Sequence, residues 1–187
     1  MTRTLILSAC LTGMLSALAG ASALAAEPVV LAPVPALDVP LTKVHGTATA
    51  ILSGGCFWAI QDVFRHVHSV PQAVSGYTGG AASTAHYEVV STGSTCHAKS
   101  LKITYEASAI SYGTLLRIFV SVAANPTELD YQGPDEGTQY RSMIWVENAK
   151  QREVADAYLK QLAAAYTFDA RIATQIATAM PYFRAEA

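Results

Sequence analysis

The sequence is poor in cysteine and in charge, and it lacks basic clusters. It has three cysteines in 187 residues, and 14% of its residues are charged. Three cysteines are too few for a disulfide scaffold, so a hydrophobic core must hold the fold. No run of Lys or Arg suits nucleic acid or an anionic membrane, and no Gly-rich phosphate loop is present. We therefore expect no nucleic-acid partner and no stable membrane association.

The N-terminal stretch has one early cation, Arg3, followed by a long uncharged apolar run that ends in Ala-Leu-Ala at 23–25. This pattern predicts a cleaved secretory signal peptide over residues 1–25, and with it export to the periplasm or secretion. The alternative is a lipoprotein box that ends at Cys10, but the apolar run continues past that cysteine. Signal removal leaves Cys56 and Cys96 as the only thiols.

The rest of the chain divides into a proline-rich segment and one domain. Residues 26–45 contain four prolines and predict an extended linker or a strap lying on the domain. Residues 46–187 alternate between strand-like and helical patterns, which predicts an α/β (α+β) fold. We expect a two-layer α/β sandwich with a ferredoxin-like core and a mixed sheet. Expected strands are 47–55, 72–80, 86–93, 97–106, 139–147 and 171–177; expected helices are 56–67, 111–124 and 148–166.

One hexapeptide, SGGCFW at 53–58, points to chemistry. A helix that begins near Cys56 places the thiol where unpaired N–H groups and the positive end of the dipole favour a thiolate, the nucleophilic form of cysteine. The alternative is an inert core cysteine, which is the commoner fate of a lone thiol. Phe57 and Trp58 favour the reactive interpretation, because they suit a pocket for a methyl or thioether group.

Five segments in order carry a resemblance to a known family: GCFW at 55–58, GYTGG at 76–80, HYEVV at 86–90, TGSTCHAKS at 92–100 and QGPDEGTQYRS at 132–142. Together they resemble peptide methionine sulfoxide reductase A over about residues 46–183. The resemblance implies reduction of the S-epimer of methionine sulfoxide in proteins and peptides, as repair after oxidation. It also implies no metal and no organic cofactor, and a thioredoxin-like external thiol reductant. The expected partners are oxidised proteins and that reductant, and we expect a monomer.

The resemblance also implies roles for individual residues. Cys56 would attack the sulfoxide sulfur and become a sulfenic acid, while Phe57 and Trp58 hold the S-methyl group. The residues implied to surround the sulfoxide oxygen are Tyr87, Asp135 and Tyr140. A developing oxyanion needs such donors. Without the flanking motifs, the alternative is that Tyr87 and Tyr140 are core residues whose hydroxyl groups have other hydrogen-bond partners.

Lys99 is the main departure from the family pattern, because it stands where a glutamate is expected to donate the proton. A lysine can donate a proton and stabilise an oxyanion, but with different geometry. Alternatively Lys99 turns outward and leaves an impaired site. The sequence therefore keeps two hypotheses: a working reductase with Lys99 as a catalytic group, and a weakened paralogue that binds methionine sulfoxide without efficient turnover. A thiol hydrolase using Cys56 and His97 is the third and weakest alternative.

Cys96 is the second departure, because the family usually has glycine before His97. A side chain at this position would strain the backbone if φ is positive there. Cys96 would either resolve the Cys56 sulfenic acid as a disulfide or remain a passive thiol. The longer tail with resolving cysteines that many relatives carry is not in this sequence. We therefore expect regeneration by Cys96 or by direct attack of an external thiol.

Overall fold

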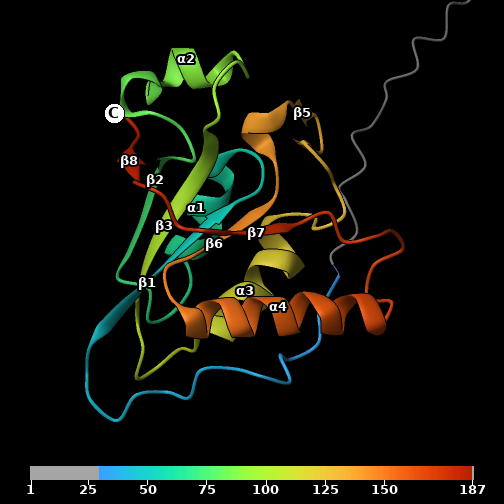
Figure 1. Ribbon diagram of the computed structural model, residues 1–187. Helices are drawn as coiled ribbons and strands as arrows, with labels where there is room; N and C mark the ends of the chain where they lie inside the picture. Colours follow the sequence, from blue (N-terminus) through green and yellow to red (C-terminus); the bar gives the residue numbers. More distant parts are fainter. Residues whose placement is uncertain (1–29, 187) are drawn as a thin grey trace, which may run out of the picture.

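The computed structural model describes residues 30–186, so the predicted signal peptide at 1–25 lies outside the described residues. A six-stranded sheet forms the body of the domain in the order β7-β6-β1-β3-β2-β8. The pair β6–β7 is parallel and the other neighbours are antiparallel, so the sheet is mixed. The helices lie mainly on one face of this sheet (Figure 1). The predicted two-layer α/β sandwich with a mixed sheet is confirmed.

The strands follow the alternating segments of the sequence closely. They are β1 Thr47–Ser53, β2 Gln72–Thr78, β3 Ala98–Glu106, β6 Met143–Val146, β7 Gln175–Thr178 and β8 Phe183–Arg184, with a separate hairpin of β4 Tyr131–Gln132 and β5 Asp135–Glu136. The short edge strand β8 and the β4–β5 hairpin were not expected, since two residues are too few to show a period.

The helices include one that the sequence interpretation missed. They are α1 Phe57–Arg65, α2 Tyr87–Ser91, α3 Tyr112–Ile118 and α4 Ala149–Ala164, with short turns η1 Ala82–Thr84, η2 Phe119–Ala123 and η3 Thr138–Tyr140. Side-chain caps begin two of them: Ser111 accepts a hydrogen bond from Thr114 N, and Asn148 accepts one from Gln151 N. The helix expected to run through 124 ends at Ile118 and continues as the π-type turn η2.

The expected strand at 86–93 is wrong, because its centre forms α2. Tyr87 and Val90 are three residues apart, which is helical spacing, and both pack in the small cluster around Phe57 and Tyr77. Gly93 has φ +73°, so the chain turns out of the helix there. The two valines, which favour strands, misled the assignment because tertiary packing overrides weak local preference.

The main core lies between the sheet and α1, α3 and α4. Apolar side chains of β1, β3 and β6 pack there against Phe64, Phe119 and Tyr158, all nearly or fully buried. The opposite face of the sheet is covered by the C-terminal segment, where Tyr182 packs near Trp145. Alternation along β3 places Leu101 on the helix face and Ala98 on the opposite face.

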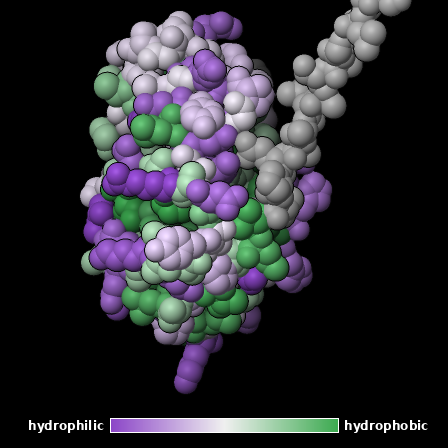
Figure 2. Space-filling view, turned by 90° about the vertical axis from the view of Figure 1, so that its right-hand side faces the viewer, coloured by the Kyte–Doolittle hydropathy of each residue, from purple (hydrophilic) through white to green (hydrophobic). Residues whose placement is uncertain are grey.

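Residues 30–45 run as an extended strap along α3 and α4, low in Figure 1. Tyr158 Oη donates to Pro33 O at 2.8 Å, and Asp38 accepts hydrogen bonds from Ser111 Oγ and Gly113 N. Figure 2 shows apolar side chains gathering in the middle and lower parts of this face of the molecule. The strap's exposed apolar residues are Leu31, Val34, Leu37, Leu41 and Val44. Within residues 30–186, none of the helices has the length and apolarity needed to cross a membrane.

Candidate active site

Cys56 is the N-cap residue of α1 and is half-buried. The two preceding glycines let the chain enter the helix in little space. A Cβ on Gly54 would lie 2.6 Å from Ala124 Cβ, and Gly55 has φ +96° with Gln132 Cβ 2.8 Å from where its own Cβ would be. Neither position accepts a side chain without movement. The predicted placement of the thiol at a helix N-terminus is therefore confirmed by the geometry.

Aromatic side chains form a wall beside Cys56. Phe57 is buried, with its ring centroid 5.2 Å from that of Trp58 and 6.4 Å from that of Tyr87. Trp58 is 56% exposed and stacks on Tyr87 at 5.5 Å. An indole that is stacked on one face yet open to solvent suits an apolar ligand group arriving from outside. The three residues that the motifs associated with substrate thus lie together.

Lys99 lies under these rings and does not turn outward. Its side chain is only 3% exposed, and Nζ donates to Tyr140 Oη at 3.2 Å. The ammonium also lies 4.7 Å from the Tyr87 ring centroid and 4.6 Å from that of Tyr140, with Phe57 at 5.6 Å. Cation–π attraction stabilises a charge in such a place. The outward alternative for Lys99 is therefore wrong.

The β3 register explains why Lys99 faces the site. Lys99 pairs with Tyr77 of β2, and directly opposed residues share a face of the sheet. Two-residue periodicity puts Lys99 on the same face as Leu101, which packs in the helix-side core near α1. Lys99 thus comes to lie beside the first turn of α1.

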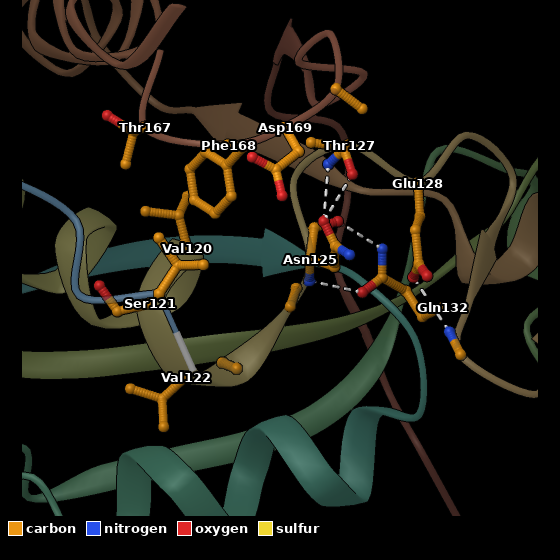
Figure 3. Close-up of a pocket in the computed structure, with 15 residues that line it drawn as sticks. Val120, Ser121, Val122, Asn125, Thr127, Glu128, Gln132, Thr167, Phe168 and Asp169 are labelled. Atoms are coloured by element: carbon orange, nitrogen blue, oxygen red, sulfur yellow. Dashed lines mark hydrogen bonds between the residues drawn. The ribbon is translucent and has the colours of Figure 1, made fainter. Parts of the chain in front are cut away.

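The β4–β5 hairpin carries Asp135 close to the entry of α1. Gln132 packs on Gly55, and Gln132 and Asn125 exchange two hydrogen bonds of 2.8 Å, seen in Figure 3. The half-buried Asp135 pairs with Gln132 in the hairpin. Its side chain forms no hydrogen bond with the other candidate site residues, so the structure does not join Asp135 to the group around Lys99.

A cavity of about 450 Å³ lies behind this hairpin, between η2 and the loop after α4 (Figure 3). Val120, Gln132 and Phe168 are among its lining residues, whereas Cys56 and Lys99 are not. Neither the thiol nor the ammonium lines this cavity, so the chemistry of the candidate site rests on the aromatic surface beside Cys56.

Cys96 and His97 lie just before β3 and are held by Arg141. Arg141 donates from Nη2 to Cys96 O at 2.8 Å and from Nη1 to His97 O at 3.2 Å. Burial lowers the pKa of Arg141, against the opposing influence of Asp130. Cys96 is exposed and neither it nor Cys56 is in a disulfide. Sequence reasoning missed Arg141, although it directly follows Tyr140 in the QGPDEGTQYRS motif.

The strain expected at Cys96 is absent. Among described non-glycine residues, positive φ occurs only at Ser69, Asp130 and Tyr166. His97 is fully buried and its Nε2 is 2.9 Å from Ala81 O, while Nδ1 has no partner. An imidazole fixed in this way is a packing residue, which argues against the thiol hydrolase alternative.

The C-terminal segment contacts the first residue of α2, and Figure 1 shows the C-terminus beside this helix. The Glu186 carboxylate accepts hydrogen bonds from Tyr87 N and from Tyr77 Oη, each at 3.0 Å, and lies 3.2 Å from His86 Nδ1. Backbone N–H groups, its own first and that of Tyr87 next, lower the pKa of Glu186. No local pattern in the sequence predicts this contact, because it joins residues 99 positions apart in the chain.

The arrangement defines a class of protein before any comparison. A half-buried thiol at a helix N-terminus, in a region that also holds a buried cation, a phenol and an aromatic wall, is typical of a cysteine-dependent enzyme. Residues 30–186 contain no group of three or more His, Cys, Asp or Glu side chains placed to hold a metal ion.

Residues 48–187 match the family model described as "Peptide methionine sulfoxide reductase". The chain belongs to this family, as the motifs predicted, and is by class a peptide-methionine (S)-S-oxide reductase. It is 53% identical over 141 residues to MsrA 2 of Mesorhizobium japonicum, covering 75% of this chain and 72% of that protein. It is 42% identical over 156 residues to MsrA 2 of Synechocystis sp., covering 82% and 73%.

Solved structures agree with this assignment. The reduced form of Mxr1 from Saccharomyces cerevisiae superimposes with a TM-score of 0.64 at 26% identity, covering 78% of this chain and 87% of that one. Methionine sulfoxide reductase A of Corynebacterium diphtheriae gives 0.59 at 28% identity, covering 75% and 71%. The fold of the described domain is thus the fold of the family.

Proposed function

We propose that this chain reduces the S-epimer of methionine sulfoxide in oxidised proteins and peptides, with Cys56 as the nucleophile. The observation that carries the proposal is the position of Cys56 at the start of α1 beside the Phe57–Trp58 wall. The thiolate attacks the sulfoxide sulfur and takes its oxygen. Thiol and sulfoxide become sulfenic acid and thioether, so the substrate sulfur gains two electrons and the Cys56 sulfur loses two. This chemistry needs no metal and no organic cofactor.

We assign the proton transfer to Lys99. Its ammonium is directed at Tyr140 Oη and lies among the rings that adjoin Cys56, so it can donate to an oxygen that gains negative charge there. Tyr87 and Tyr140 border the same space and add phenolic donors. Asp135 on the hairpin is assigned to ordering water near the oxygen. Preformed donors of this kind stabilise a developing oxyanion more than a neutral sulfoxide.

The second candidate is a weakened paralogue that binds methionine sulfoxide but turns it over poorly. The observation that favours it is the same hydrogen bond, because Lys99 Nζ is already engaged by Tyr140 Oη and the surrounding rings. A proton that is held in this way is harder to give away. The two candidates differ in the rate of the first turnover and agree on the binding wall.

Regeneration of Cys56 is proposed to use an external thiol, such as a thioredoxin-like protein. The thiol attacks the sulfenic sulfur, releases water and leaves a mixed disulfide, which a second thiol resolves. Cys96 is the internal alternative to the external thiol, because it would attack the Cys56 sulfenic acid, release water and form a Cys56–Cys96 disulfide. Its exposure favours reaction with an outside reductant, whereas the hold of Arg141 on its carbonyl restricts its backbone.

The experiment is a single-turnover assay on residues 26–187 with a peptide containing S-methionine sulfoxide and no reductant. About one equivalent of methionine, absent in Cys56→Ser, supports the reductase. After that turnover, loss of both free thiols and a Cys56–Cys96 disulfide detected by mass assign Cys96 as the resolving thiol, whereas Cys96→Ser should lose one thiol only. The methionine yield stays at one equivalent in both, because one disulfide accounts for two electrons. If no methionine forms with the native chain but Lys99→Glu produces it, the weakened paralogue is the correct reading.

We also propose export, on the N-terminal pattern alone. Substrates would then be proteins oxidised outside the cytoplasm. Intact-mass measurement of the protein from a periplasmic fraction tests this point: loss of about 25 residues supports export, and a full-length cytoplasmic chain refutes it.

A further inference from the structure

Lys99 brings to the site a buried positive charge that no acidic side chain balances. The described chain has three ion pairs, His66–Asp62, His86–Glu186 and Lys150–Glu153, and Lys99 is in none of them. Its Nζ has one hydrogen bond, to Tyr140 Oη, although an ammonium has three N–H groups to donate. The remaining contacts of the ammonium are with ring faces, which attract charge but accept no strong hydrogen bond.

The surroundings add further attraction for a negative group. Cys56 stands at the start of α1, a nine-residue helix whose first N–H groups carry partial positive charge. Tyr140 Oη accepts from Lys99 and so has its own proton free to donate. Next to these donors, Phe57 and Trp58 form an apolar wall that is open to solvent at the indole.

We propose that this site binds small organic anions that carry a methyl group beside the anionic oxygens, such as methanesulfinate, and that these anions regulate access to Cys56. The oxygens would face Lys99 and Tyr140, and the methyl group would lie against Phe57 and Trp58. The inference rests on the proposed function, because it assigns a regulator to the same site. A glutamate in place of Lys99 would repel such a ligand, so the property belongs to this chain's own residue.

The proposal depends on the negative charge of the ligand. Two probes of nearly equal shape, one charged and one neutral, therefore distinguish binding through charge from binding through apolar packing. Methanesulfinate is an anion, and dimethyl sulfone is its neutral counterpart with a second methyl group. Calorimetric titration uses the Cys56→Ser variant of residues 26–187, which excludes any reaction of the thiol. We expect methanesulfinate to bind about ten- to a hundredfold more tightly than dimethyl sulfone, the range for losing one hydrogen bond to a charged group.

Lys99→Met in the same background should remove that difference and leave dimethyl sulfone unaffected. The matched control is Lys102→Met, because Lys102 is on the same strand, lies 6.0 Å from the Tyr182 ring centroid and faces the opposite side of the sheet. Equal affinity for the two probes would overturn the proposal. So would a loss in Lys102→Met as large as that in Lys99→Met, which would indicate general attraction to positive charge.

Assays on the native chain distinguish failure of the proposed anion site from failure of the proposed function. Anion binding without any single turnover of methionine sulfoxide refutes the reductase and leaves the anion site standing. Turnover that methanesulfinate does not inhibit refutes the anion site and leaves the reductase standing. When both hold, methanesulfinate is expected to inhibit competitively, and Lys99→Glu is expected to abolish the inhibition.

Discussion

Replacing Lys99 by methionine should separate stability from activity. Burial of an ammonium costs several kcal/mol. Against that cost stand one hydrogen bond to Tyr140 Oη, worth about 1.5–3 kcal/mol, and contacts with three rings, worth about 0.5–2 kcal/mol each. These terms nearly cancel. A methionine has similar length and gains about 0.3–1.5 kcal/mol from each sulfur–aromatic contact.

Lys99→Met should therefore unfold at the same urea concentration as the native chain or a higher one, with a gain of about 0–3 kcal/mol. Its first turnover of S-methionine sulfoxide should slow by about a hundredfold or more, the usual effect of removing a general acid. Urea unfolding followed by fluorescence measures the first quantity, and quenched-flow detection of methionine measures the second.

Two outcomes would refute this reasoning. A loss of stability above about 2 kcal/mol in Lys99→Met would mean that the charge holds the fold together rather than serving the site. An unchanged first turnover would mean that another group supplies the proton. Tyr140→Phe is the companion variant, because it leaves the ammonium without its hydrogen bond and should cost about 1–3 kcal/mol.

Three further predictions concern the parts that support the site. Gly55→Ala, with φ +96° and a close Gln132, should lose about 1–3 kcal/mol in urea unfolding, while Gly46→Ala, with no neighbour within 4 Å, should change little. Burial raises the pKa of Tyr158 to about 12, so the stability that its hydroxyl group contributes is complete below about pH 10 and is lost as the pH rises towards 12. Tyr158→Phe should lose about 1 kcal/mol of unfolding free energy at neutral pH and flatten the alkaline unfolding curve. The pKa of Glu186 is lowered, so the hydrogen bond that its carboxylate accepts from Tyr87 N stabilises the fold above about pH 4.5 and is lost on acidification. Glu186→Gln should weaken the acid dependence of hydrogen exchange in α2. An unchanged dependence would contradict the assignment.

Much of the fold could be predicted because its strands and helices carry clear periods. The alternation of β3 and the caps at Ser111 and Asn148 were visible in the sequence. Segment α2 was missed because five residues with two valines give no reliable period. Its helical state depends on packing against Phe57 and Tyr77, which only the folded chain brings close.

The candidate site could likewise be predicted only in part from the sequence. Motifs predicted the group around Cys56. The alternation of β3 also indicates the orientation of Lys99, since two-residue spacing puts it on the same face as the apolar Leu101, which lies in the core. The contacts of Arg141 with Cys96 O and of Glu186 with Tyr87 N could not be predicted. They join backbone atoms to side chains across long separations, and no local pattern encodes them.

The Glu186 contact has a consequence for the order in which the chain folds. Tyr77 and Glu186 are 109 residues apart, and Tyr158 and Pro33 are 125 apart. During synthesis, β2 can therefore pair with the edge strand β8, and Tyr87 N can donate to the Glu186 carboxylate, only after the C-terminal residues have been added. Contacts of such high sequence separation slow folding. A newly made chain thus remains open for longer than a chain whose contacts are mostly local.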